Sequence, residues 1–161
     1  CLLKHEMVRE AECYKSPFGK VHITISQRIP VLAVVSSNGY YYVDSDRRVM
    51  PIRGEVDKNL PMLNGAVTER AAMAEYFDFV SWLRDDKYWK ERIRAIHVKT
   101  SKYIVLTQEG SDAKIILGEL EDYEDKLAKL RQLYTKGFDQ IGYPEYREYD
   151  LRFDNQVVGR K

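Results

Sequence analysis

The stretch that decides the fold is residues 93–137, IRAIHVKTSKYIVLTQEGSDAKIILGELEDYEDKLAKLRQLYTKG. Its first part has three short runs rich in β-branched residues, at 93–99, 103–108 and 113–117, and a glycine-containing turn joins the last two, as is typical of a β-meander. The second part, 119–136, begins with acidic residues and is followed by a glycine at 137, as is typical of an α-helix with a glycine C-cap. Acidic residues near the N-terminus of a helix interact favourably with the helix dipole. The stretch therefore predicts an α+β fold.

Further strands are expected upstream of this stretch. A hairpin is predicted at 12–25, because SPFG at 16–19 is typical of a tight turn and an alternating apolar–polar strand follows it. The runs at 31–35 and 40–43 flank Asn-Gly at 38–39, which is a strong signal for a hairpin turn. The N-terminal half of the chain is therefore predicted to be rich in strands.

The remaining segments complete the expected architecture. Prolines and glycines interrupt 51–65, so we expect irregular chain over the surface there. Thr68 is the expected N-cap of a helix whose apolar residues recur at three- and four-residue steps as far as Leu83. Alternation at 149–153 predicts a strand, and a last short strand is expected to start at 157–158. The prediction is two helices packed on a mostly antiparallel or mixed sheet.

Composition narrows the class of protein. The chain has 161 residues, of which 44% are hydrophobic and 32% are charged, which favours an ordered globular protein. Its 26 basic and 25 acidic residues are interleaved, so there is no basic stripe and nucleic-acid binding has no support. No apolar run approaches the roughly twenty residues that a membrane helix needs. Because the chain starts at Cys1 and 2–8 is expected to be a helix already begun, we expect the sequence to be a piece of a longer parent protein, which leaves a membrane anchor upstream open.

Catalytic and metal sites have little support in the sequence. None of the short mechanistic motifs is present, and no cofactor is predicted. Cys13 with His22 would be a nucleophile and base, but a histidine on the polar face of a strand is more often solvated. His5 and His97 lie on other elements, so no metal site is expected. Cys1 and Cys13 are compatible with one disulfide or with two unpaired thiols.

Acidic and aromatic clusters have structural explanations as well. The carboxylates at 119–125 and at 85–86 lack calcium-loop spacing, and those at 119–125 belong at a helix start. The three tyrosines at 40–42 would be a stacking platform for sugars or bases if they shared a face. On a strand, however, two of them lie on one face and one on the other, which favours cross-strand packing.

Two patches in the N-terminal part resemble a known family. EAECY at 10–14, followed by the hairpin and by QRIPV at 27–31, is similar to the end of the small polypeptide-transport-associated (POTRA) domain of the FtsQ/DivIB family of bacterial cell-division proteins. The resemblance implies that 1–34 is the C-terminal part of a POTRA-like domain and that 35–161 is the family's β domain.

Later patches continue the resemblance in the same order. YVDSD at 42–46 and LPMLNG at 60–65 resemble the start of the family's β domain, and YDLRFD at 149–154 with VG at 158–159 resembles its end. One departure is Arg47-Arg48, in a turn where the family usually has glycine. If that turn needs a positive φ, the substitution costs about 1 kcal/mol.

The resemblance implies a function as well as a fold. The parent protein would be anchored by one helix in the inner membrane with this region on the periplasmic side, and would be a scaffold rather than an enzyme. It would join early and late division proteins by binding FtsB-like and FtsL-like partners through a C-terminal strand, with an arginine bonding to an acidic residue and a phenylalanine as an apolar anchor. The implied partner-binding residues are Arg152, Phe153, Asn155, Val157, Val158, Gly159 and Arg160.

Two other functions fit parts of the sequence. A periplasmic enzyme acting on the cell wall would need arranged carboxylates, or a cysteine and a histidine, in a cleft. A POTRA-type chaperone of outer-membrane proteins would be supported by tandem complete repeats, and none is visible. A free strand edge without such a cleft would favour the scaffold.

Overall fold

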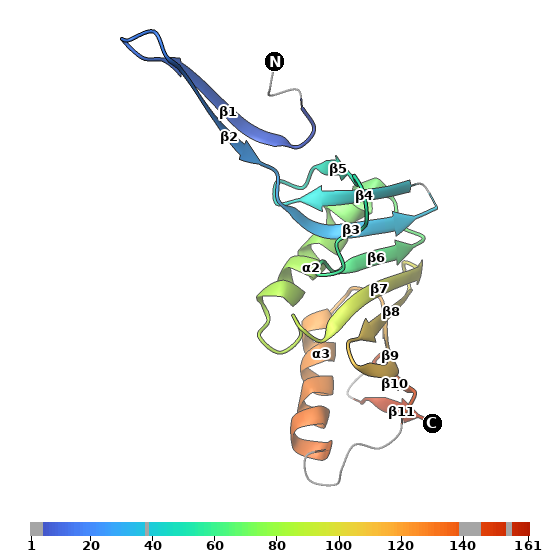
Figure 1. Cartoon of the computed structure of the whole chain (residues 1–161). Coiled ribbons are helices and arrows are strands. Elements are labelled where there is room, and N and C mark those ends of the chain that lie inside the picture. Colours follow the sequence, from blue (N-terminus) through green and yellow to red (C-terminus); the bar gives the residue numbers. More distant parts are fainter. Residues whose placement is uncertain (1–4, 38, 139–145, 154–155) are drawn as a thin grey trace.

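The computed structural model describes residues 5–37, 39–138, 146–153 and 156–161. Within these residues the fold is α+β, with a nine-stranded sheet and a separate two-stranded hairpin (Figure 1). The strands are β1 Val8–Lys15, β2 Val21–Gln27, β3 Pro30–Ser36, β4 Gly39–Asp44, β5 Val49–Pro51, β6 Met62–Gly65, β7 Ile93–Thr100, β8 Tyr103–Gln108, β9 Ser111–Gly118, β10 Glu148–Asp150 and β11 Val158–Arg160. The helices are α1 Glu69–Met73, α2 Glu75–Asp85 and α3 Tyr123–Gln132, and α3 continues into a π-helical turn, Leu133–Phe138.

The large sheet is mixed, and its strands lie in the order β11-β10-β9-β8-β7-β6-β3-β4-β5. The predicted meander is confirmed, because β7, β8 and β9 pair antiparallel in sequence order. The prediction that 51–65 is irregular surface chain was wrong for its last four residues. They form β6, which lies in the middle of the sheet, parallel to both β3 and β7, with Leu63 fully buried. Four residues are too few to show a strand periodicity, and β6 is defined by its pairing with two neighbours.

The two expected helices are present, with different boundaries. The Thr68 hydroxyl accepts a hydrogen bond from the Ala71 main-chain N–H at 3.2 Å, which confirms the N-cap, and the helix then breaks at Ala74 into α1 and α2. The second helix was expected over 119–136 with a C-cap at Gly137, and both bounds were wrong. The α-helix starts at Tyr123 because Asp122 has a left-handed φ of 53°, and Gly137 lies inside the π-helical turn.

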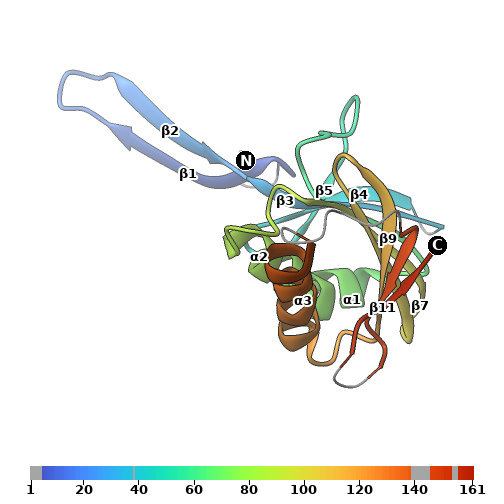
Figure 2. The same ribbon diagram turned by 90° about the horizontal axis from the view of Figure 1, so that it is seen from below.

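Helices α2 and α3 cover the same face of the large sheet (Figures 1 and 2). The core lies between these two layers, and its fully buried members include Phe79, Ile96, Leu106, Ile115 and Leu127. Successive side chains of a strand point to opposite faces, so the residues between the core positions of β7, β8 and β9 lie on the other face, which none of the helices in the described residues covers. That open face is available for binding.

The β1–β2 hairpin projects from the large sheet (Figures 1 and 2). Its base is held by an ion pair between Arg28 and the buried Asp44, and by a second pair between Arg9 and Asp46. The expected helix over 2–8 was wrong at its end, because Val8 begins β1 and pairs with Gln27; residues 1–4 lie outside the described residues.

The turn after β4 has the strain that the sequence predicted. Arg47 has a φ of 59°, in the left-handed region that glycine would occupy without cost. Its guanidinium lies 4.8 Å from the ring centroid of Phe77 and pairs with Asp78. These contacts offset a strain of about 1 kcal/mol, so arginine is tolerated at a position that glycine would occupy without strain.

The expected division into 1–34 and 35–161 stays a prediction. β3 runs through this boundary as a single strand of the large sheet.

Candidate functional site

The catalytic candidates in the hairpin do not come together. Cys13 pairs with Ile23 and Tyr14 pairs with His22, so Cys13 and His22 occupy alternate positions and point to opposite faces of the hairpin. The His22 ring instead stacks on Tyr14, with ring centroids 5.0 Å apart. Cys13 is an exposed free thiol, and Cys1 lies outside the described residues. Nothing here resembles an activated nucleophile.

The other candidates also have structural roles. In the described part of the chain no group of three histidine, cysteine or acidic residues could hold a metal ion. Tyr41 is buried while Tyr40 is 71% exposed, so neighbouring tyrosines lie on opposite faces, as the sequence predicted. The Tyr42 hydroxyl accepts a hydrogen bond from the Asp57 N–H at 2.9 Å. The Asp86 carboxylate accepts bonds from the two N–H groups of residues 88 and 89.

The two edges of the large sheet differ. One edge is β5, which ends in Pro51, a residue that has no N–H to donate. The other edge is β11, which pairs antiparallel with β10 and is the last strand among the described residues; β10 in turn is parallel to β9. β11 contains no proline, so its outward main-chain groups can accept a further strand.

A buried carboxylate organises this C-terminal edge. Asp150 has no exposed side-chain surface, and it accepts bonds from the Arg152 main-chain N–H at 3.1 Å, from Nε at 2.9 Å and from Nη2 at 2.7 Å. Arg160 of β11 adds a longer contact at 3.4 Å, which ties the edge strand to β10. The hydrogen bonds from the Arg152 side chain are the main reason that the pKa of Asp150 is lowered from its ordinary value.

The structure corrects the expected strand at 149–153. β10 ends at Asp150, because the bond from the Arg152 N–H to the Asp150 carboxylate turns the chain there. Leu151 is buried while Phe153 is 43% exposed, although alternation predicted that both share one face. An exposed phenylalanine in the connection between β10 and β11 is available to a partner.

The remaining expected partner-binding residues lie on or beside β11. Val157 is partly buried against the core, Val158 is partly buried in β11, and Arg160 is exposed. Gly159 packs under an aromatic ring, since a Cβ there would lie 3.0 Å from carbons of Tyr146. Asn155 lies outside the described residues. The edge strand therefore exposes residues on one side and is held against the domain on the other.

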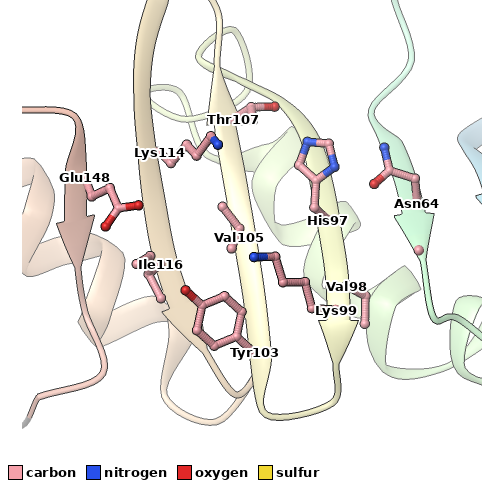
Figure 3. Close-up of a pocket in the computed structure, with 11 residues that line it drawn as sticks. Asn64, His97, Val98, Lys99, Tyr103, Val105, Thr107, Lys114, Ile116 and Glu148 are labelled. Carbon is pink, nitrogen blue, oxygen red and sulfur yellow. The ribbon is translucent and has the colours of Figure 1, made fainter.

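The open face of the sheet has a groove that the sequence did not single out. Its volume is about 450 Å³, and Figure 3 shows its residues projecting from β6 to β10. Polar side chains surround an apolar floor of Val105 and Ile116. The polar and charged lining residues are Asn64, His97, Lys99, Tyr103, Thr107, Lys114 and Glu148. These residues come from five different strands, and only the order of the strands in the sheet brings them together.

Tyr103 links this groove to the C-terminal edge. The Lys99 ammonium lies 5.0 Å from the centroid of its ring, and the Arg152 guanidinium lies 5.2 Å from the same centroid. Both cations are attracted by the ring. The pKa of His97 is lowered, mainly by burial and also by the nearby charge of Lys114.

This geometry defines an α+β domain with helices on one face of a mixed sheet, an open opposite face and a free terminal strand. The sequence profile of the family described as FtsQ/DivIB, C-terminal related, matches residues 29–160, and the chain belongs to this family. The resemblance drawn from the sequence patches is thereby confirmed.

No curated protein matches the sequence. A solved structure with some similarity is that of the major extracytoplasmic domain of the trans isomer of the bacterial cell-division protein DivIB from Geobacillus stearothermophilus. It is 16% identical, with a TM-score of 0.46 over 64% of this chain and 87% of that chain. Among the described residues of the present chain, no helix combines the length and apolar character needed to cross a membrane.

Proposed function

We propose that this chain is part of a non-enzymatic scaffold that links early and late cell-division proteins by binding FtsB-like and FtsL-like segments. Membership of a division-protein family supports this proposal. The observation that carries it is the free edge of β11, which has a strand partner on one side only in the described part of the chain. A partner strand added there would extend the nine-stranded sheet through main-chain hydrogen bonds.

The proposal includes the setting of the domain. The parent protein is anchored by one helix in the inner membrane, with this region on the periplasmic side. Residues 1–34 are the end of a POTRA-like domain, and 35–161 is the β domain that binds partners. The geometry of the hairpin supports a role outside catalysis, because Cys13 and His22 point to opposite faces.

The structure changes the role that we assign to Arg152. Its Nε and Nη2 are both bonded to Asp150, so Arg152 positions the edge, and a partner carboxylate would meet its remaining guanidinium surface. Arg160 is 51% exposed, and with the described residues its side chain makes one long contact, at 3.4 Å, so it is more available to the partner. Phe153, at 43% exposure, would be the apolar anchor of the interface.

Val158→Pro is the variant that tests strand pairing. Proline removes an N–H from a three-residue strand, so we expect the affinity for a periplasmic fragment of an FtsB-like protein to fall about tenfold or more. Phe153→Ala tests the anchor without changing the strand, and a similar loss is expected. Isothermal titration calorimetry measures both affinities, and circular dichroism checks that the variants are folded.

Variants of the hairpin are the matched controls. Cys13→Ser and His22→Ala change exposed residues far from β11, and partner affinity should not change. Folded Val158→Pro and Phe153→Ala variants that bind as tightly as the parent would show that the C-terminal edge is not the partner site.

A further inference from the structure

The charges around the groove on the open face are unbalanced. Lys99 and Lys114 are both exposed, and within the described residues neither is in an ion pair. Figure 3 shows that their side chains extend from β7 and β9 toward β8, where Val105 lies between their ammonium groups. Glu148 is the one carboxylate of the lining; it projects from β10 as the register partner of Lys114, whose side chain extends the other way, toward β8. A negative charge above Val105 would therefore meet two ammonium groups.

The neighbouring side chains suit a carboxylate on a peptide. Asn64 and Thr107 supply hydrogen-bonding groups, while Val105, 6% exposed, and Ile116, 2% exposed, form an apolar floor. In one bound peptide, an acidic side chain would contact the lysines at the sides of the groove while an apolar side chain would contact its floor. The groove volume, about 450 Å³, is within the usual range for a site that holds a few side chains.

The groove is also within reach of a segment bound at the edge. β9, which carries Lys114, lies two strands away from β11 in the sheet, and neighbouring strands are about 5 Å apart. A partner strand paired outside β11 lies three strand spacings from β9 and five from β7, so its chain would reach Lys114 after about five extended residues and Lys99 after about eight. Tyr103, between the cations of Lys99 and Arg152, lies on the way.

We infer that the groove binds an acidic segment of the partner that pairs with β11, with carboxylates held by Lys99 and Lys114. This inference rests on the proposed function of the β11 edge. It goes further in naming the chemistry of a second contact, an acidic peptide that crosses the open face of the sheet, and in assigning that contact to residues of the meander.

Charge reversal tests the inference on the folded chain. Lys99→Glu combined with Lys114→Glu should weaken binding of the FtsB-like periplasmic fragment about tenfold or more at low ionic strength, because two attractions become repulsions. The loss should shrink as sodium chloride is added. Lys99→Ala combined with Lys114→Ala should give a smaller loss of about threefold to tenfold, and it remains informative if the reversed variant does not fold.

The matched control changes the same charge elsewhere. Lys87→Glu combined with Lys90→Glu alters two exposed lysines after α2, outside the groove, and should leave the affinity unchanged. Replacing acidic residues of the partner segment by lysine should restore binding to the charge-reversed variant and weaken binding to the parent chain.

The outcomes distinguish this inference from the proposed function. If Val158→Pro weakens binding and both lysine variants bind like the parent, the groove assignment is wrong and the edge proposal stands. If Val158→Pro and the lysine variants all bind like the parent, both are wrong. Weakening by Val158→Pro and by charge reversal, with unchanged affinity in the control, supports both.

Discussion

Gly65→Ala is expected to lower the free energy of unfolding by about 3 kcal/mol or more. Gly65 ends β6 in the middle of the sheet with a φ of 102°, a conformation that other residues rarely adopt. A Cβ at this position would lie 2.2 Å from the Val98 carbonyl oxygen and 3.0 Å from its carbon. Because these are main-chain atoms of the paired strand β7, the clash is relieved only by moving β6 away from β7.

Gly110→Ala is the matched control for this prediction. Gly110 also has a positive φ, 69°, but a Cβ there would meet nothing within 4 Å. We therefore expect only the backbone strain, about 1 kcal/mol. Urea denaturation followed by circular dichroism measures both values. Equal losses for the two variants would contradict the close approach of β6 and β7.

Asp150→Ala is expected to lower the free energy of unfolding by about 2 kcal/mol. The change removes a buried acceptor of three hydrogen bonds from Arg152 and of a longer one from Arg160. Because both arginine side chains are partly exposed, at 36% and 51%, water solvates them after the change and limits the cost. The β10–β11 pair should loosen, so partner affinity should fall as well.

The pH dependence gives a second test of Asp150. Its pKa in the folded state is lowered, chiefly by the Arg152 side chain, so the carboxylate stabilises the fold above its ordinary pKa. That stabilisation is lost as the pH falls through the ordinary value toward the lower folded value. The parent chain should therefore lose more stability between about pH 5 and pH 2 than Asp150→Asn does. Asp112→Asn changes an exposed carboxylate of β9 and should follow the parent; parallel pH curves for the parent and Asp150→Asn would contradict the ion-pair role.

Local patterns in the sequence predicted much of the fold. The meander, the Thr68 N-cap and the strained turn at Arg47 each depend on residues within a few positions of one another, and each is present. The parallel strand β6 could not be predicted, because four residues carry no periodicity and pairing with β3 and β7 defines the strand. The end of the α3 region was missed because a π-helical turn continues past the residue expected to cap it.

For the candidate site, the structure adds contacts that the sequence did not indicate. The partner-binding role expected for residues at 152–160 stays a prediction, and the structure adds that Asp150 holds Arg152 and Arg160 in place. The groove between Lys99 and Lys114 is formed by residues of separate strands. Which residues become neighbours across a mixed sheet depends on the order of the strands, and this order cannot be inferred from local patterns in a single sequence.

Hydrogen exchange of the β11 amides, measured with and without a periplasmic fragment of an FtsB-like protein, tests the central claim most directly. If a partner strand adds to this edge, its main-chain hydrogen bonds should slow the exchange of an outward-facing amide within Val158–Arg160 by about tenfold or more at saturating fragment. The amides of the β1–β2 hairpin should exchange as before. Binding that leaves the β11 amides unprotected while other segments become protected would contradict the account.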